Sequence, residues 1–354
     1  METTASKTDL RDLSINELEQ FILSLGEKKF RARQIYKWLY QKRVDDFEQM
    51  SNMSKHVRQQ LSACCSIQKP EPKYILESKY GDAVKFGFAF NNTSYIIESV
   101  LLFDDKRRTA CVSSQIGCAL GCSFCETAKL GFIRNLTQQE ILAQLIGIND
   151  YLCSKSDKLV TNVVFMGMGE ALSNFANFRK ALEVIMHEDG FNLGGRRITV
   201  STAGVIPSIE RLINENLNVG LAISLNAWND KLRDEVMPIN KKYNIAQLVK
   251  IAKRYFEKTG RRVTFEYVVI DGITNTPGAK KSLSKLLSGF PCKINLIPLN
   301  TAGDIKENTV SEDKVLQFSQ ELHKLGLAAT VRKSRGRDIM GACGQLTAYD
   351  ATTV

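Results

Sequence analysis

Residues 111–125 read CVSSQIGCALGCSFC and hold four of the nine cysteines of the chain. Cys118, Cys122 and Cys125 follow the spacing C-x3-C-x2-C, and a glycine precedes each of the first two. Glycine lets a backbone wrap closely around a bound group, and closely spaced thiolates are typical ligands of iron–sulfur clusters. A cubane cluster held by only three cysteines keeps one iron for another ligand. The stretch therefore predicts a metal centre that can also bind substrate or cofactor.

A structural zinc site completed by Cys111 is the alternative for the same cysteines. Structural zinc usually uses two separated Cys or Cys/His pairs, whereas His56, His187 and His323 are all remote from this loop in sequence. An odd cysteine count in a reducing compartment favours thiols kept for metal binding or catalysis. A zinc-stabilised RNA-binding protein therefore stays open beside an iron–sulfur enzyme.

The cysteine stretch begins a repeating pattern of predicted strands and helices. Short runs rich in Val and Ile predict strands at 110–114, 162–167, 197–202, 219–225, 262–270, 292–299 and 328–333. Helical patterns lie between them, at 138–152, 176–188, 206–215, 245–258, 279–289 and 311–325. This alternation predicts an α/β fold with a parallel sheet, a full or partial βα barrel. Chemistry in such barrels collects at the carboxyl ends of the strands, which is where the cysteine loop falls.

The N-terminal part has the pattern of a small helical unit. Ser14 and Glu17 have capping-box spacing, and Gly26 stands where a helix is expected to end. A second helical pattern at 28–43 carries seven Lys and Arg residues and no acid, so its face is either a solvated surface or a phosphate-binding one. We expect a helical RNA-binding accessory domain at 1–73, an extended β segment carrying Glu98 at 74–103, and the barrel core with a C-terminal cysteine loop at 104–354.

Composition limits the class of protein. The chain has 354 residues, 44% of them hydrophobic, and a formal charge of +10 with a pI near 9.1. This charge favours a polyanionic partner, nucleic acid first. The polar start METTASKTDLRDLS is unlike a signal peptide, and no stretch approaches the length of an apolar membrane span. We expect a cytoplasmic protein without membrane contact.

Several separated motifs resemble the radical S-adenosylmethionine superfamily and, within it, the dual-specificity 23S rRNA and tRNA adenine-C2 methyltransferases. They are ACVSSQIGCALGCSFC, VFMGMGEAL, ITVSTAGVIPSI, LAISLNAWND, MPINKKYNI, INLIPLN and RGRDIMGACGQL, in the family's order between about Phe30 and Leu346. The resemblance implies a partial (βα)6-type barrel and a [4Fe–4S] cluster held by Cys118, Cys122 and Cys125. It also implies two molecules of S-adenosylmethionine for each methylation.

The same resemblance implies where S-adenosylmethionine binds. Gly169 and Glu170 of the GMGE motif match cofactor contacts of the family, and a carboxylate can accept hydrogen bonds from the cofactor's ammonium group. The other implied contacts each end a later strand and are Ser201, Ser224, Leu225, Asn226 and Asn300. Because strand ends meet at one mouth of a barrel, we expect these groups to converge.

Three further residues match catalytic positions of the family. Cys343 matches a cysteine that becomes methylated, Cys111 the thiol that resolves a covalent adduct, and Glu98 the base for the C2 proton. In the implied mechanism, one S-adenosylmethionine methylates Cys343 and a second is cleaved reductively to a radical. The radical takes hydrogen from the S-methyl group, and the methylene radical attacks C2. A disulfide between the two thiols then releases the product. Gly341 and Gly344 predict a mobile loop around Cys343.

The implied partners are RNA and an electron donor. By resemblance, the substrates are an adenosine at the peptidyl-transferase centre of 23S rRNA and the adenosine 3′ of the anticodon in some tRNAs. A flavodoxin or ferredoxin would reduce the cluster, and the enzyme would act as a monomer. The basic runs at 106–108 and 332–337 are expected to neutralise phosphates.

Two motifs differ from the sequence that is usual in the family. Ala171 stands where proline is common, and Asn226 and Trp228 replace the more usual His and Pro. Alanine at the first position also occurs in related enzymes that methylate adenine at C8. C8 methylation of rRNA therefore stays open as the alternative activity.

Overall fold

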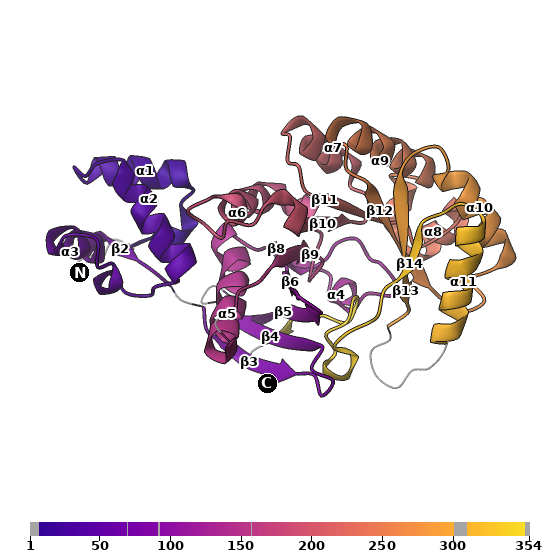
Figure 1. The fold of residues 1–354 in the computed structure, drawn as a ribbon, viewed down its shortest axis with the longest axis horizontal. Coiled ribbons are helices and arrows are strands. Elements are labelled where there is room, and N and C mark those ends of the chain that lie inside the picture. Colours follow the sequence, from indigo (N-terminus) through magenta and orange to yellow (C-terminus); the bar gives the residue numbers. More distant parts are fainter. Residues whose placement is uncertain (1–6, 69, 91–92, 157, 301–309, 351–354) are drawn as a thin grey trace.

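The computed structural model describes residues 7–68, 70–90, 93–156, 158–300 and 310–350. A small helical unit at the N-terminal end lies beside a larger body in which helices cover one broad sheet (Figure 1). Within these residues, no helix is both long enough and apolar enough to cross a membrane.

Eleven strands of the described chain form one sheet, and seven of them are parallel, in the order β14-β13-β12-β11-β10-β9-β6. Their bounds are β6 (Arg107–Cys111), β9 (Asn162–Phe165), β10 (Ile198–Thr202), β11 (Gly220–Ser224), β12 (Val263–Val269), β13 (Cys292–Pro298) and β14 (Ala329–Val331). Every strand predicted for the core is present. The parallel order begins at β6 and ends at β14 without closing, so the partial-barrel prediction is confirmed.

The predicted helices connect these strands. They are α5 (Gln138–Ser156), α6 (Phe175–Met186), α7 (Ile206–Asn214), α9 (Ile245–Thr259), α10 (Pro277–Leu287) and α11 (Glu312–Lys324). Their apolar faces pack on the sheet; for instance, the rings of Phe178 on α6 and Phe165 on β9 meet edge to face at 4.8 Å. The sequence patterns missed α4 (Glu126–Lys129) and α8 (Asp230–Val236), two short helices at strand ends.

An antiparallel layer extends the sheet beyond β6. It consists of β3 (Pro72–Glu77), β4 (Ala83–Ala89) and β5 (Tyr95–Asp104), and the C-terminal β15 (Tyr349–Asp350) pairs with β5. Helix α5 covers β4, where the rings of Phe86 and Tyr151 meet at 5.3 Å. The C-terminal segment therefore lies next to the strand that carries Glu98. The chain division at residues 73 and 103 stays a prediction.

The N-terminal unit contains the two predicted helices. Its elements are β1 (Thr8–Asp9), η1 (Leu10–Asp12), α1 (Ile15–Ser24), α2 (Phe30–Lys37), a π-helical turn η2 (Trp38–Lys42), η3 (Phe47–Gln49), α3 (Lys55–Cys64) and β2 (Cys65–Ser66). Ser14 and Glu17 form the predicted capping box at the start of α1. Gly26 follows its end with a left-handed φ of 80°, as the C-cap prediction required.

Some of the basic side chains of α2 and η2, and Arg43 directly after them, form ion pairs with the barrel core. Arg33 and Lys37 both contact Asp189, at 2.5 and 3.1 Å, although the Asp189 side chain is only 2% exposed. Arg43 contacts Asp150 on α5 at 2.7 Å. These cations hold the N-terminal unit against the core, a role that neither interpretation of the sequence included.

Candidate active site

The carboxyl ends of β9 to β14, the cysteine loop and the C-terminal segment enclose a cavity of about 170 Å³. Most of the predicted site residues line it: Cys118, Cys122, Cys125, Gly169, Glu170, Ser201, Ser224, Asn226, Asn300 and Cys343. They come from segments spread over more than 200 residues of sequence. The predicted convergence at one mouth of the barrel is therefore present for this set.

The three loop thiols face this cavity together. Burial raises the pKa of Cys118 to about 11, and the nearby charges of Glu170 and Cys125 act in the same direction. Burial raises the pKa of Cys122 to about 12, with further increases from Cys125 and Cys118. Thiolates so placed repel one another in a poorly solvated loop, and a cationic iron centre between them would remove this cost.

The donor set fits an iron–sulfur cluster. Within the described chain, no group of three or more His, Cys, Asp or Glu side chains could hold one metal ion. A [4Fe–4S] cluster is wider than one ion, and each cysteine binds its own iron, so the thiolates need not converge on one point. The predicted role of Cys118, Cys122 and Cys125 is compatible with this arrangement.

A small hairpin that the sequence patterns missed frames the cysteine loop. Strands β7 (Gln115–Gly117) and β8 (Phe132–Asn135) pair antiparallel, and Cys118 N–H donates to the carbonyl oxygen of Gly131 at 2.8 Å. Gly117 has φ of 69°, and a Cβ atom there would lie 1.7 Å from that same oxygen. Gly117 is thus required because two backbone segments meet.

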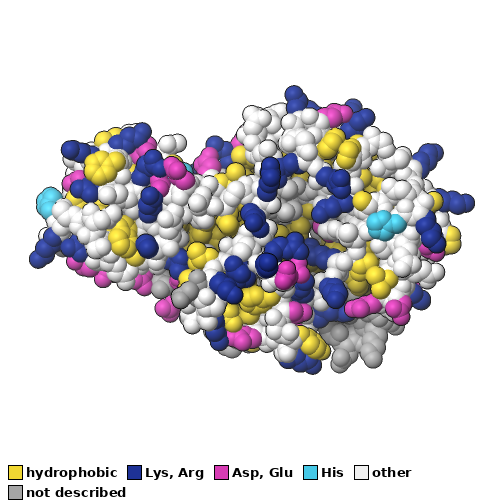
Figure 2. All heavy atoms as spheres, in the orientation of Figure 1, with side chains coloured by type: hydrophobic (Ala, Val, Ile, Leu, Met, Phe, Trp, Pro, Cys, Tyr) yellow, Lys and Arg dark blue, Asp and Glu magenta, His cyan; other side chains and the backbone are white. Residues whose placement is uncertain are grey.

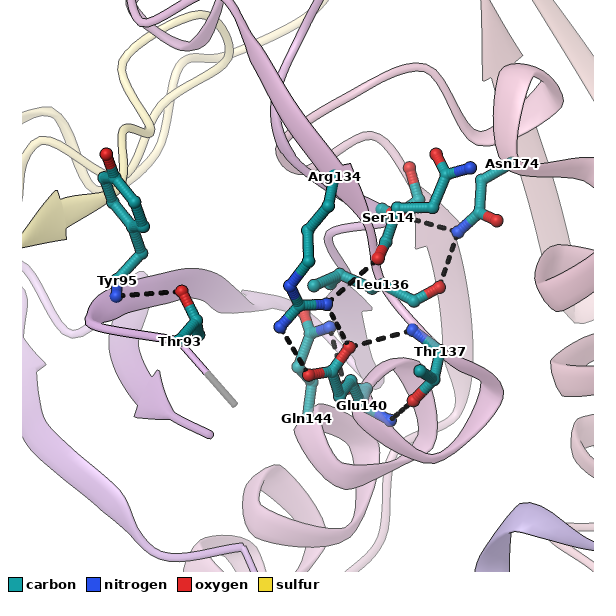
Figure 3. Close-up of polar contacts among 10 residues, drawn as sticks. Thr93, Tyr95, Ser114, Arg134, Leu136, Thr137, Glu140, Gln144 and Asn174 are labelled. Atoms are coloured by element: carbon teal, nitrogen blue, oxygen red, sulfur yellow. Dashed lines mark hydrogen bonds and ion pairs between the residues drawn. The ribbon is translucent and has the colours of Figure 1, made fainter. Parts of the chain in front are cut away.

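Polar contacts anchor this hairpin to the barrel (Figure 3). Arg134 of β8 donates two hydrogen bonds to the carboxylate of Glu140 on α5, at 2.7 and 2.8 Å. The Asn174 amide donates to the carbonyl oxygens of Ser114 and Leu136, at 2.8 and 2.7 Å. The base of the cysteine loop is therefore fixed to α5 and to the segment after β9.

The GMGE motif packs against the strand that precedes the cysteine loop. A Cβ atom on Gly167 would lie 2.6 Å from Ser113 Oγ, and one on Gly169, where φ is 87°, would lie 2.4 Å from Gln115 Cβ. Glu170 accepts hydrogen bonds from Leu172 N–H and Ala203 N–H, at 3.2 and 2.8 Å. Burial nevertheless raises the pKa of Glu170 to about 7. An ammonium group in the cavity would favour its carboxylate form.

The other predicted cofactor contacts differ in how they meet the cavity. Leu225 is fully buried and is not part of its lining. Asn226 has a left-handed φ of 55°, and its side-chain oxygen accepts from Val268 N–H at 3.0 Å, which ties β11 to β12. The Asn300 amide donates to Cys343 O at 3.2 Å, while its oxygen has no hydrogen-bond partner among the described residues. A ligand with donors could satisfy this buried acceptor.

The two thiols predicted to be catalytic, Cys111 and Cys343, line one adjoining cavity. Cys111 ends β6 and Cys343 lies in the C-terminal segment, and both border this second space together with Arg332. All nine cysteines of the chain are free thiols. Burial raises the pKa of Cys111 to about 12, Cys343 raises it further, and Arg332 acts in the opposite direction. The structure thus brings together two thiols that are 232 residues apart in sequence.

Hydrogen bonds hold the segment that directly follows Cys343. Glu126 N–H donates to Gly344 O at 2.8 Å, and the Thr127 hydroxyl donates to Leu346 O at 2.5 Å. The segment therefore rests on α4, directly after the third cysteine of the loop. The predicted mobility of this loop stays a prediction.

Glu98 does not join the other predicted catalytic residues. Its side chain is fully buried and lines neither cavity. One carboxylate oxygen contacts Lys85 Nζ at 2.7 Å and accepts from the Tyr74 hydroxyl at 2.6 Å, and the other accepts from Thr347 N–H at 3.0 Å. Glu98 lies beneath the C-terminal segment, because its partner Thr347 follows Cys343 by four residues, but its side chain is separated from the cavities.

The predicted basic runs are partly engaged within the protein. Arg335 contacts Asp104 at 2.7 Å, Arg107 also pairs with Asp104, and Arg332 lines the cavities instead of the outer surface. The expectation that Arg332 neutralises phosphates is not supported by this inward position. Lys and Arg side chains gather around the middle of the face in Figure 2.

Sequence reasoning missed two buried charges beside the cavity. Arg233 donates to the carbonyl oxygens of Ala203 and Ser224, at 2.7 and 2.9 Å, and so orders the ends of β10 and β11. Glu266 on β12 lines the cavity and is 5% exposed. An acid in the middle of the mostly apolar strand RVTFEYVVI was the signal that could have identified Glu266.

Family models match two parts of the chain. Residues 8–67 match the ribosomal RNA large subunit methyltransferase N-terminal domain, and residues 112–277 match the radical SAM superfamily. The first match covers the helical unit, and the second begins at the cysteine stretch.

Full-length relatives and a solved structure agree with these matches. The chain is 43% identical to the dual-specificity RNA methyltransferase RlmN of Syntrophus aciditrophicus, with 97% of each chain covered. It is also 43% identical to the protein of the same name from Marinobacter nauticus, over 98% of this chain and 94% of that one. A radical SAM methyltransferase from Sphaerobacter thermophilus superposes with a TM-score of 0.89 at 40% identity, covering 96% of this chain and 99% of the other.

Proposed function

The chain belongs to the dual-specificity RNA methyltransferase RlmN family of the radical SAM superfamily, and from this premise we propose that it methylates adenine C2. The proposed substrates are one adenosine in the peptidyl-transferase centre of 23S rRNA and the adenosine 3′ of the anticodon in some tRNAs. As a member of this family, the chain is an S-adenosylmethionine-dependent RNA methyltransferase with a [4Fe–4S] cluster, and it uses two S-adenosylmethionine molecules for each methylation.

In this proposal, Cys118, Cys122 and Cys125 hold the cluster. The residues proposed to hold S-adenosylmethionine are Gly169, Glu170, Ser201, Ser224, Leu225, Asn226 and Asn300. When bound, these cofactors supply the methyl group and a carbon radical. The carboxylate of Glu170 accepts from the cofactor's ammonium group, and the unpartnered oxygen of Asn300 accepts from another donor of the ligand.

Three residues are proposed to act on the reacting atoms. Cys343 carries the methyl group to adenine. After the carbon radical has added to C2, Glu98 takes the C2 proton, and the adduct gives up one electron, which the cluster, when bound, would accept. Attack of the Cys111 sulfur on the Cys343 sulfur forms a disulfide and breaks the sulfur–carbon bond of the adduct. The electron pair stays on the released carbon, which takes a proton and becomes the methyl group of the product.

The shared cavity of Cys111 and Cys343 is the observation that carries this proposal. A methyltransferase that displaces methyl directly needs no thiol, whereas a covalent route needs one thiol to carry the group and another to release it. For Glu98 to reach the substrate, the segment around Thr347 must move, because the Thr347 N–H now occupies one of its oxygens.

Alanine variants of the two thiols test the mechanism. Cys343→Ala should lose both the S-methyl mark on its peptide and all RNA methylation. Cys111→Ala should keep the mark on Cys343 but remain covalently attached to RNA in denaturing gels. Cys292→Ala is the matched control, since Cys292 starts β13 away from both cavities. Multiple-turnover methylation by the Cys343→Ala enzyme would refute the proposal.

Nucleoside mass spectrometry against synthetic standards tests the regiochemistry. Digests of rRNA and tRNA after reaction should contain 2-methyladenosine, whereas 8-methyladenosine would assign the alternative activity. We further propose that a flavodoxin or ferredoxin supplies the electrons, that residues 1–73 contribute RNA binding, and that the enzyme is a monomer. Light scattering of the purified enzyme tests the last point directly.

A further inference from the structure

We infer that Glu266 is an additional contact of the S-adenosyl ligand, whose carboxylate accepts hydrogen bonds from the ribose hydroxyl groups. This inference rests on the proposed placement of S-adenosylmethionine in the barrel cavity. It assigns a role to a buried acid outside all of the motifs that the sequence analysis singled out.

The first support is the incomplete hydrogen bonding of Glu266. One of its oxygens accepts from Asn295 Nδ2 at 3.1 Å, and Asn295 is in turn held by the Thr330 hydroxyl at 2.6 Å. The other oxygen, Oε2, is buried and has no hydrogen-bond partner among the described residues. Leaving a charged acceptor unpaired in the interior is costly. Because this oxygen belongs to a residue that lines the cavity, we infer that a hydrogen-bond donor of a bound ligand pairs with it.

The position of Glu266 on the sheet identifies the part of the ligand. Glu266 lies opposite Ser224 of β11 in the parallel register, and Ser224 is one of the proposed cofactor contacts. Glu170, proposed for the ammonium group, follows β9, three strands away from β12. At about 4.8 Å between strands, the two carboxylates begin roughly 14 Å apart along the sheet. They therefore suit separate parts of one extended ligand.

The charge around Glu266 favours a neutral donor over a second cation. Burial raises the pKa of this carboxyl group, and the guanidinium of Arg332 acts against that increase. Because Arg332 already supplies positive charge to the same cavity, an uncharged diol completes the hydrogen bonding without adding charge. A carboxylate that accepts from ribose hydroxyls is a recurrent solution in nucleotide-binding sites.

Equilibrium binding to the cluster-containing enzyme tests this inference without any turnover. The probes are S-adenosylhomocysteine and its 2′-deoxy and 3′-deoxy analogues, measured with the wild type and with Glu266→Ala. Loss of a charge-assisted hydrogen bond should weaken S-adenosylhomocysteine binding by about 10- to 100-fold in the variant. The wild type should lose a similar factor when the contacted hydroxyl is missing, and the variant should lose almost nothing more.

Val268→Ala is the matched control, because Val268 lies two residues further along β12 and lines the same cavity. It should bind every probe somewhat more weakly but keep the wild-type sensitivity to the missing hydroxyl. Equal sensitivity to the hydroxyl in wild type and Glu266→Ala would overturn the inference, as would unchanged affinity of Glu266→Ala for S-adenosylhomocysteine. Urea unfolding without ligand verifies that the variants are folded.

The outcome is separable from the proposed function. If the wild type formed 8-methyladenosine, the C2 proposal would fail while the hydroxyl sensitivity of Glu266 could still be measured. If Glu266→Ala kept that sensitivity while wild type formed 2-methyladenosine, only the inference about Glu266 would fail.

Discussion

Alanine in place of Gly117 should disrupt the cysteine loop, whereas alanine in place of Gly131 should be tolerated. Gly117 ends β7 and pairs with Phe132 of β8, the residue directly after Gly131, and both glycines have left-handed φ values, 69° and 72°. A Cβ atom at Gly117 would lie 1.7 Å from the Gly131 carbonyl oxygen, while one at Gly131 would meet nothing within 4 Å. A comparison of the two alanine variants therefore separates the free-energy cost of the left-handed backbone conformation, which both share, from the cost of steric overlap, which only Gly117→Ala has.

The expected magnitudes follow from these contacts. Both variants carry the left-handed penalty of about 1–2 kcal/mol. Gly117→Ala must also push the two strands apart, which breaks the 2.8 Å hydrogen bond from Cys118 N–H to Gly131 O. With roughly 1 kcal/mol for that bond and about 1–3 kcal/mol for the overpacking, its total is about 3–6 kcal/mol.

Iron and sulfide analysis after anaerobic reconstitution, together with urea unfolding, measures the effect. Gly117→Ala should bind far less iron than the wild type, because displacement of Cys118 separates the three thiols. Gly131→Ala should load normally and lose only about 1–2 kcal/mol of unfolding free energy. Equal iron content and equal stability of the two variants would refute the reasoning.

Four further predictions concern buried or paired charges, and the first two of them concern Glu170. Burial raises the pKa of Glu170 to about 7, and the cofactor's ammonium group binds the carboxylate form better than the protonated form. The affinity for S-adenosylmethionine should therefore rise as pH increases from about 6 to 8. Glu170→Gln should abolish this pH dependence. Because the pKa of Glu170 is higher in the folded than in the unfolded protein, the ligand-free protein loses the stability linked to Glu170 as pH rises between 4.5 and about 7. At pH 8, Glu170→Gln should therefore unfold at a higher urea concentration than the wild type. Lys85→Met should lower the free energy of unfolding by about 3–5 kcal/mol, since it leaves the fully buried Glu98 without its 2.7 Å ion pair. The double variant with Glu98→Gln should recover most of this loss. If the double variant were as unstable as Lys85→Met, the pairing argument would be wrong. Replacing Arg33 and Lys37 by alanine should lower the free energy of unfolding, because it removes both cations that pair with the nearly buried Asp189, and it should leave the salt dependence of RNA binding unchanged. Weaker RNA binding at full stability would instead assign this face to phosphate contacts.

Local sequence patterns were sufficient for the parallel strands and the long helices of the core, and for the prediction of a metal centre after its first strand. Alternation of apolar runs and helical periodicity located the seven parallel strands and the long helices, because those patterns depend on neighbours within a few residues. The spacing of Cys118, Cys122 and Cys125 predicted a metal centre for the same reason, since one loop holds all three ligands. The strands of the β7–β8 hairpin have only three and four residues, too few for such a periodicity, and their pairing was missed.

The direction of side chains and the partners of charges were decided by the tertiary structure. Arg332 and Arg335 belong to one basic run, yet Arg332 lines the cavities and Arg335 pairs with Asp104. Asp189, which pairs with Arg33 of α2, is 156 residues away in sequence, and no local pattern encodes that contact. Glu98 and Glu266 are both acids in predicted strands, but only packing across the sheet pairs the first with Lys85 and leaves the second with an unpartnered oxygen beside the cavity. Periodicity specifies which residues form a strand, whereas the electrostatic surroundings of each side chain depend on segments that meet only in the folded chain.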